Sequence, residues 1–257
     1  MIPEAAITAW GVSAPWPTRA QVEQDLLLSR LIVELASHPY LRDEMIFRGG
    51  TCLHKLHLTV PHRYSEDLDY VRATAGGIQP LTQAVTNVGE ALGFEVRTQM
   101  GAQPKVYLRT TATSGELLRI KVEVNTYERT PALPLTRVRH DVRSSWFSGS
   151  ADVQTFVPAE LVATKIRALY QRKKGRDLFD LWLALTEMKL AGEAITAAFV
   201  PYRPHGLTTR LAVQNLRRKL QDADFRDDLV PLVATWPADY DIDRAADLVI
   251  AEVLERL

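Results

Sequence analysis

The sequence has few of the features that mark secreted or membrane proteins. It contains one cysteine, Cys52, among 257 residues, so it cannot form an internal disulfide, and this agrees with a reducing compartment. No apolar run approaches the length that spans a bilayer, and residues 1–19 lack the basic start and apolar core of a signal peptide. We therefore expect a cytoplasmic protein that makes no membrane contact.

The sequence also lacks an excess of charge of either sign, since 31 Lys and Arg residues balance 31 Asp and Glu residues. Any affinity for nucleic acid must then come from a local patch. There are two basic patches: Arg137, Arg139, His140 and Arg143, followed by Trp146 and Phe147, and Arg172, Lys173, Lys174 and Arg176. Each could follow a phosphate backbone, or could be an ordinary solvated loop or helix end.

A Gly-Gly-Thr sequence links two segments of different character. Gly49, Gly50 and Thr51 lie between an apolar segment, residues 45–47, and a segment whose leucines have helical spacing, residues 51–56. This pattern predicts a strand, a glycine turn and a helix. Glycines let a backbone approach a phosphate closely, and the helix N-terminus offers donors to it. The alternative is a tight turn without a ligand.

Two aspartates, Asp67 and Asp69, stand one residue apart. If Leu68 and Tyr70 face a core from a β-strand, the period of two places both carboxylates on the opposite face. The carboxylates would repel each other, and Mg²⁺ or Mn²⁺ would relieve the repulsion while binding nucleotide phosphates. A solvated turn is the alternative, because Asp-x-Asp is common in surface loops.

A third carboxylate comes from a segment of alternating polarity, residues 117–125. Its apolar side chains share one face, and the other face carries Lys121, Glu123 and Asn125. If this strand neighbours the aspartate strand, Glu123 can join the aspartates. An ordinary solvent-facing strand is an equal alternative.

Together these residues resemble the DNA polymerase β type nucleotidyltransferase fold in its AbiEii toxin branch, which includes the MenT toxins. The resemblance is carried by residues 49–51, by Arg63-Tyr64-Ser65-Glu66-Asp67-Leu68-Asp69 and by Glu123. Residues 165–169 and 176–181 are similar to the lysine and Arg-Asp-x-x-Asp-Leu motifs of that branch. One departure is the interval from Gly50 to Asp67, which is longer than is usual in the wider superfamily.

The resemblance implies an α+β fold, with a polymerase β-like core of mixed sheet flanked by helices. We expect this core, with an N-terminal bracing helix, over residues 1–152. A helical C-terminal domain over residues 153–257 is expected to complete the active-site cleft.

The resemblance also implies roles for particular residues. The metal ligands would be Asp67, Asp69 and Glu123; the catalytic residues would be Asp67, Asp69, Lys165 and Asp177; and the NTP site would contain Gly49, Gly50, Thr51, Arg63, Ser65 and Lys165. From the residues alone, a solvated helix lysine is the favoured interpretation of Lys165, and Asp177 could equally serve only to favour the helix dipole.

The function implied is that of a toxin in a toxin–antitoxin or phage-defence pair, with a cognate antitoxin as partner. It would transfer nucleotides from an NTP to an RNA 3′ end, expected to be that of a tRNA, and so block translation. Modification of a protein hydroxyl or a small molecule remains open, as does a non-catalytic nucleotide- or RNA-binding module. Nucleotidyl transfer needs cations at the phosphates, and three carboxylates with a lysine suit that need better than they suit simple binding.

The local pattern predicts further elements. Thr18 and Gln21 form a possible capping box for a helix that ends near Ala36. We predict another helix over residues 81–92 and strands over 94–99, 105–110 and 117–125, followed by an irregular or partly extended connector over 129–153. From Pro158 onward we predict helices, with stops near Gly175, Gly192 and residues 201–206, and a closing helix from Asp241.

Overall fold

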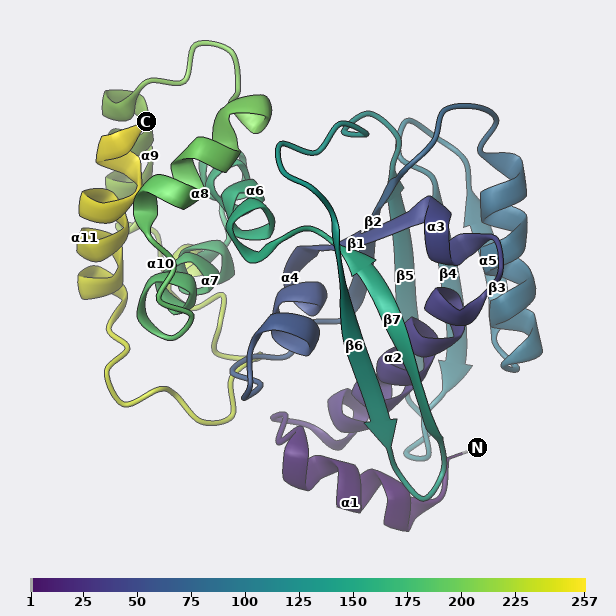
Figure 1. Cartoon of the computed structure of the whole chain (residues 1–257). Coiled ribbons are helices and arrows are strands. Elements are labelled where there is room, and N and C mark those ends of the chain that lie inside the picture. The colour runs from purple at the N-terminus through teal and green to yellow at the C-terminus, as the bar shows by residue number, and fades with distance from the viewer. Residues whose placement is uncertain (1) are drawn as a thin grey trace. The chain divides into compact units, whose positions relative to one another are not determined.

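The computed structural model describes residues 2–257 and divides into two compact units (Figure 1). The sheet unit contains the residues up to Thr130 together with Leu135–Phe156, and the helical unit contains Pro131–Pro134 together with Val157–Leu257. Within residues 2–257, no helix combines the length and the apolar character needed to cross a bilayer.

The sheet unit is built on a seven-stranded mixed sheet in the order β3-β4-β5-β2-β1-β7-β6. Its strands are β1 (Met45–Arg48), β2 (Asp67–Arg72), β3 (Glu95–Gln99), β4 (Lys105–Thr111), β5 (Leu117–Asn125), β6 (Thr136–Arg143) and β7 (Ser148–Thr155). Strand β2 runs parallel to β5, β1 runs parallel to β7, and the remaining neighbours are antiparallel. The predicted α+β class, a mixed sheet with flanking helices, is confirmed.

The helices of this unit brace the sheet. They are α1 (Glu4–Ser13), α2 (Arg19–Ser37), α3 (Leu41–Glu44), α4 (Gly49–Cys52), a π-helical turn η1 (Leu53–His57) and α5 (Gln79–Ala91). Helix α2 begins at the predicted capping box: the Thr18 hydroxyl accepts from the Gln21 amide at 3.2 Å, and the Gln21 side chain accepts from the Thr18 amide at 3.0 Å. Helix α2 packs against β5, β6 and β7, and α5 packs against β3 and β4.

Residues 129–153 were predicted to be irregular or partly extended, and most of the segment is extended, because it forms the β6–β7 hairpin. His140 and Val142 are buried while Asp141 between them is exposed, which is the alternation of a strand with one covered face. The prolines, serines and Gly149 suggested a connector and not two paired strands. In the structure Gly149 lies within β7, where a Cβ atom would approach the Phe147 ring to 2.7 Å.

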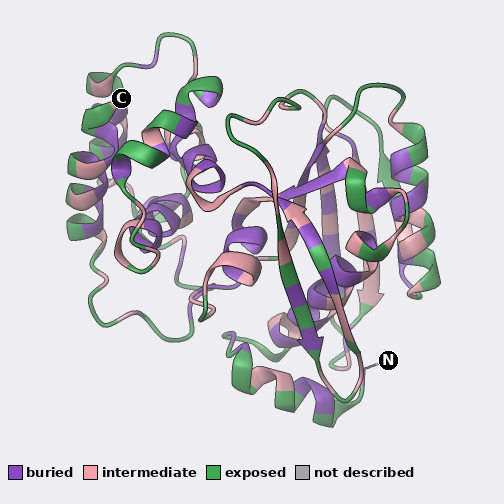
Figure 2. Cartoon of the chain, viewed as in Figure 1, coloured by how far each residue is buried: buried purple, intermediate pink, exposed green. Residues whose placement is uncertain are grey.

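The helical unit contains α6 (Pro158–Gln171), α7 (Gly175–Thr186), α8 (Gly192–Phe199), η2 (Val200–Tyr202), α9 (Thr209–Lys219), α10 (Ala223–Arg226), α11 (Ile242–Glu252) and η3 (Leu254–Arg256). Its core lies along α6 and α7, most of whose residues are buried (Figure 2). Asp241 caps the closing helix α11 by accepting from two amides of its first turn.

Helix breaks lie near Gly175 and Gly192 as predicted, since α6 ends at Gln171 and α7 ends at Thr186, but the glycines themselves begin α7 and α8. A Cβ atom on Gly175 would lie 2.2 Å from the Phe225 carbonyl oxygen, and one on Gly192 would lie 1.8 Å from the Glu252 carbonyl oxygen. Both glycines are therefore required by close backbone approach, which is a tertiary constraint that the local sequence does not reveal.

Candidate active site

A row of four charged side chains crosses the sheet unit. Arg48 on β1 is opposite Asp69 on β2, Asp69 is opposite Glu123 on β5, and Glu123 is opposite Lys105 on β4. Residues in register share one face of a sheet. Asp67 lies on the same face as Asp69, two residues before it. The prediction that Asp67, Asp69 and Glu123 gather on one face is confirmed.

Lys121 lies between two of these carboxylates. It is in register with Asp67, and its Nζ atom is 3.0 Å from Asp67 Oδ2 and 3.0 Å from Glu123 Oε2. Lys105 is a second, more distant cation, with its Nζ atom 3.5 Å from Glu123 Oε2. Among residues 2–257, no three His, Cys, Asp or Glu side chains converge as a ready-made metal centre. The Lys121 ammonium thus lies where a cation would be shared by Asp67 and Glu123.

The aspartates are incompletely neutralised. Burial raises the pKa of Asp69, opposed by the Arg48 guanidinium and reinforced by the neighbouring Asp67 carboxylate. Burial also raises the pKa of Asp67, although Lys121 opposes the shift. Carboxylates whose charged form is disfavoured at a partly accessible position are typical of sites that gain a cation.

Arg48 has a competing partner, which limits what it does for Asp69. Its guanidinium pairs with Glu128. The Asn125 side chain holds this glutamate in place by accepting hydrogen bonds from the amides of Tyr127 at 2.8 Å and Glu128 at 3.0 Å. No sequence motif indicated a role for Arg48 or Lys121. The β1–β2 register places Arg48 opposite Asp69. In the sequence, only its position directly before the glycine turn could have suggested a role.

The glycine turn packs directly against the aspartate strand. Gly49 has a φ of +84°, and a Cβ atom there would lie 2.4 Å from Asp69 Oδ2. The Thr51 hydroxyl donates to the Asp67 carbonyl at 2.5 Å and lies 2.9 Å from the Ser65 hydroxyl. The turn and the aspartates therefore form one connected structure, as a phosphate-binding turn beside a metal site would require.

Arg63 completes this group from within the core. It is 1% exposed, and it donates to the Tyr64 carbonyl at 3.1 Å. A Cβ atom on Gly50 would lie 2.4 Å from Arg63 Nη2 and 3.1 Å from Ser65 Oγ. The five predicted NTP residues of this unit are thus neighbours, and buried Arg63 packs against the glycine turn at Gly50.

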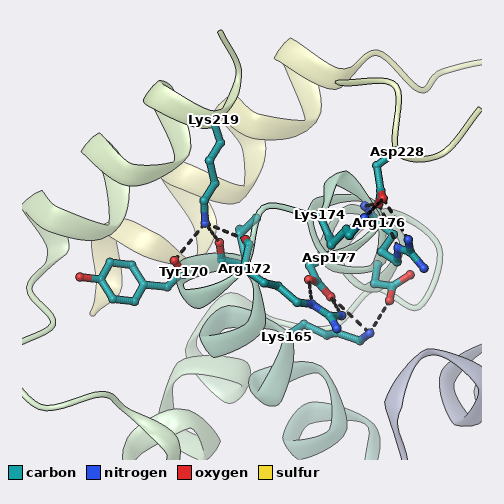
Figure 3. Close-up of polar contacts among 10 residues, drawn as sticks. Lys165, Tyr170, Arg172, Lys174, Arg176, Asp177, Lys219 and Asp228 are labelled. Atoms are coloured by element: carbon teal, nitrogen blue, oxygen red, sulfur yellow. Dashed lines mark hydrogen bonds and ion pairs between the residues drawn. The ribbon is translucent and has the colours of Figure 1, made fainter. Parts of the chain in front are cut away.

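The remaining predicted residues, Lys165 and Asp177, form a cluster inside the helical unit (Figure 3). Lys165 Nζ is 2.7 Å from Asp180 Oδ2 and 3.5 Å from Asp177 Oδ1. The Arg172 guanidinium donates two hydrogen bonds, of 2.6 and 2.7 Å, to the Asp177 carboxylate. Lys165, Asp177 and Asp180 are all buried. A phosphate would have to compete with two carboxylates for Lys165, so the phosphate role of this lysine stays a prediction.

The second basic patch is occupied by aspartates of the same unit. Lys173 pairs with Asp222 at 2.8 Å. Arg176 forms two 2.9 Å hydrogen bonds with Asp228, which also pairs with Lys174 at 3.1 Å. The Arg176–Asp228 pair lowers the pKa of Asp228 despite its burial. These cations are paired with acids around the start of α7, which lowers the net positive charge of the patch.

Lys219 is a polar feature that no sequence motif indicated. Its ammonium donates to the carbonyls of Leu169, Tyr170 and Arg172, the last at 2.9 Å, and so satisfies the end of α6 (Figure 3). Burial lowers its pKa to about 8. Its role is to cap a helix.

Comparison with known proteins agrees with this geometry. A family model described as the nucleotidyl transferase AbiEii toxin of a type IV toxin–antitoxin system matches residues 30–247. The chain belongs to the AbiEii nucleotidyltransferase toxin family. Membership confirms the resemblance given above, and a toxin of the AbiEii family implies an antitoxin partner.

Solved structures resemble the AbiEii-family chain in fold. MenT4, a nucleotidyltransferase toxin from Mycobacterium tuberculosis, is 16% identical with a TM-score of 0.52, covering 97% of this chain and 99% of its own. A protein from Helicobacter pylori, named as a nucleotidyltransferase, is 17% identical with a TM-score of 0.50, covering 99% and 96%. No curated protein matches the sequence significantly.

Proposed function

We propose that this AbiEii-family protein transfers nucleotides from an NTP to the 3′ hydroxyl of an RNA, with tRNA as the expected acceptor and Mg²⁺ or Mn²⁺ as the cofactor. The observation that carries the proposal is the group of carboxylates Asp67, Asp69 and Glu123 on one face of the sheet, in contact with a glycine turn. Family membership supports nucleotidyl transfer as the reaction.

The donor set suits a hard divalent cation. Asp67, Asp69 and Glu123 would supply oxygen ligands, which Mg²⁺ and Mn²⁺ prefer. The Lys121 ammonium, 3.0 Å from two of these acids, would have to withdraw from them when the ion binds. When bound, such an ion supplies positive charge to the acceptor hydroxyl and to the phosphates of the NTP.

The glycine turn would serve the NTP. Gly49 and Gly50 carry no side chain toward Asp69 and Arg63, so the backbone lies close to the acids. The Thr51 and Ser65 hydroxyls support the turn from the side of β2. In this arrangement NTP phosphates would meet backbone amides next to the cation that binds the carboxylates.

A labelling assay tests the proposal. Purified protein is incubated with Mg²⁺, each labelled NTP in turn and total tRNA, and the products are separated into RNA and protein. We expect label in the RNA from wild-type protein, and none from the Asp67→Asn/Asp69→Asn variant. Glu95→Gln is the matched control, because it removes an exposed charge from the edge strand β3 of the same sheet. Label confined to protein, or equal labelling by the aspartate variant, would overturn the proposal.

A further inference from the structure

Lys121 lies at the centre of the carboxylate face, and the family resemblance gives it no task. Its side chain comes from β5, in register with Asp67 on β2 and with Tyr107 on β4. The Nζ atom lies 3.0 Å from both Asp67 Oδ2 and Glu123 Oε2. An ammonium between two acids competes with any other cation that these acids would bind.

The pairing of Lys121 differs from that of a buried structural ion pair. The side chains of Lys121, Asp67 and Glu123 are 23%, 35% and 20% exposed. In the helical unit Lys165 also bridges two acids, but its side chain is 5% exposed and those two acids are fully buried. A ligand therefore reaches Lys121 more easily than Lys165, and exchanging a partner costs less at a partly exposed pair than at a buried one.

Lys121 remains an ammonium at pH 7. Burial alone would lower its pKa, but the Asp67 and Glu123 carboxylates raise it above the ordinary value. The charge sits at the end of a flexible four-carbon stem, which can move from one anion to another. A divalent cation that binds the two acids would therefore displace a charged group, and that group would need a new anionic partner.

The charge balance of the face indicates which anion this would be. The three carboxylates are matched by two ammonium groups, since Lys105 Nζ lies 3.5 Å from Glu123 Oε2, while Arg48 is paired with Glu128. One negative charge is left over, and a divalent cation would turn it into one positive charge. The glycine turn lies against Asp69, so NTP phosphates bound at the turn would supply the negative charge that the face then needs.

We propose that Lys121 exchanges partners when substrate binds: its ammonium holds Asp67 and Glu123 together in the ligand-free protein and moves to an NTP phosphate when a divalent cation occupies the acids. The inference rests on the proposed function, from which it takes the cation and the NTP. Its consequence is that cation and nucleotide binding are coupled. The cation frees the ammonium for the phosphate, and the phosphate makes displacement of the ammonium less costly.

Two binding measurements on one set of variants test the exchange. The affinity for Mn²⁺ without nucleotide is measured by electron paramagnetic resonance of the free ion. The affinity for nucleotide in saturating Mn²⁺ is measured by calorimetry, with NTP analogues whose α–β bridge is a methylene group so that no transfer occurs. The analogue that wild type binds most tightly is used for the variants Lys121→Met and Lys121→Gln, and thermal unfolding is recorded for each protein.

Lys105→Met is the matched control. It removes an ammonium from the same face of the sheet, but Lys105 has one carboxylate partner at 3.5 Å, where Lys121 has two at 3.0 Å. The control therefore separates the loss of one positive charge near Glu123 from the loss of the ammonium that bridges two acids.

We expect the two affinities of Lys121→Met to change in opposite directions. Mn²⁺ alone should bind about tenfold more tightly, because no ammonium competes with it, and nucleotide in saturating Mn²⁺ should bind about tenfold more weakly, because a phosphate has lost its partner. Lys121→Gln should behave in the same way, and Lys105→Met should change both affinities by much less. The transition temperature of metal-free Lys121→Met should fall and recover with Mn²⁺, since Asp67 and Glu123 repel each other until an ion binds.

Other patterns would overturn the exchange. If Lys121 only stabilises the fold, both variants should lose both affinities. If it only competes with the cation, nucleotide affinity in saturating Mn²⁺ should stay at the wild-type value. Unchanged affinities for both ligands in a folded Lys121→Gln protein would show that Lys121 contacts neither ligand.

The two proposals fail in different ways. If wild-type protein labels no RNA but Lys121→Met still changes the two affinities in opposite directions, the exchange stands and the RNA acceptor falls. If RNA is labelled while Lys121→Met binds nucleotide as tightly as wild type, only the exchange falls.

Discussion

The two carboxylate clusters of the molecule both combine aspartates with basic side chains, but they differ in how completely the acids are neutralised. In the sheet unit, Lys121 serves two carboxylates, and burial raises the pKa of both Asp67 and Asp69. In the helical unit, Asp177 and Asp180 are buried, with Lys165 and Arg172 bringing one positive charge for each acid. The sheet-unit cluster therefore remains short of positive charge, whereas the acids of the helical-unit cluster are balanced by cations.

This difference predicts which cluster matters for activity and which for the stability of the fold. An ion pair that is buried and hydrogen-bonded costs free energy when one partner is removed, because the other charge is left unpaired. A cluster of repelling acids has little such stability to lose. We therefore expect substitutions in the sheet-unit cluster to abolish activity while sparing the fold, and substitutions in the helical-unit cluster to lower the stability of the fold.

The largest expected effect is that of Asp69→Asn on nucleotidyl transfer. Losing a ligand that positions a divalent cation removes several kcal/mol of transition-state stabilisation, so transfer should fall by about 10³-fold or more. The transition temperature should stay the same or rise, since a disfavoured charge is gone. The rate is measured by labelled NTP incorporation and the fold by thermal unfolding. A variant that unfolds, rather than one that is folded and inactive, would contradict the comparison.

The next effect is on stability. Asp180→Ala should lower the free energy of unfolding of the helical unit by about 3–5 kcal/mol, because Lys165 loses its 2.7 Å partner in a buried site. Urea denaturation measures the loss. Lys165→Met/Asp180→Leu should recover most of it, since both charges are then absent. An Asp180→Ala protein as stable as wild type would show that the cluster does not hold the helical unit together.

Gly49→Ala should lower both stability and transfer activity within the sheet-unit cluster. The residue has φ +84°, and its new methyl group would lie 2.4 Å from Asp69 Oδ2, so Asp69 must move. Gly93→Ala is the matched control, because Gly93 has φ +83° and no atom within 4 Å of the new Cβ. Both should lose about 1–3 kcal/mol of stability from backbone strain. Only Gly49→Ala should also lose transfer activity, and equal activity in the two variants would argue against the contact.

The smallest effect is on the pH dependence of stability. The folded-state pKa values of Asp67 and Asp69 lie above the unfolded value of about 3.9. The destabilisation from these charged carboxylates is present at pH 7, and it is lost as the pH falls through the raised values toward about pH 4. Urea denaturation of wild type and Asp67→Asn/Asp69→Asn across this range isolates the two groups, because other acids cancel in the difference. Wild type should gain stability relative to the variant as the pH falls.

The sequence predicted the parts of the site that depend on strand periodicity. Alternation placed Asp67 and Asp69 on one face of their strand and Glu123 on the polar face of its own, and the Gly-Gly-Thr pattern predicted the turn that contacts Asp69. The capping box at Thr18 was also readable, because its two hydrogen bonds lie within four residues. These are local rules, and they need no knowledge of tertiary packing.

The rest depended on partners far away in the chain. The charge of Lys121 could be read from the sequence, but its position between two acids follows from the β2–β5 register. Gly175 marks a backbone contact with Phe225, and the sequence pattern alone suggested a helix stop. The segment around His140 was predicted to be partly extended, but its prolines, serines and Gly149 did not indicate that it pairs as the β6–β7 hairpin.

A manganese titration tests the central claim most directly. Free Mn²⁺ is followed by electron paramagnetic resonance as wild type, Asp69→Asn and Asp180→Asn are added at a temperature where all three are folded. If the sheet-unit cluster is the cation site, Asp69→Asn should bind far less Mn²⁺ while Asp180→Asn binds it like wild type. Equal binding by wild type and Asp69→Asn, or loss of binding in a folded Asp180→Asn protein, would contradict the account.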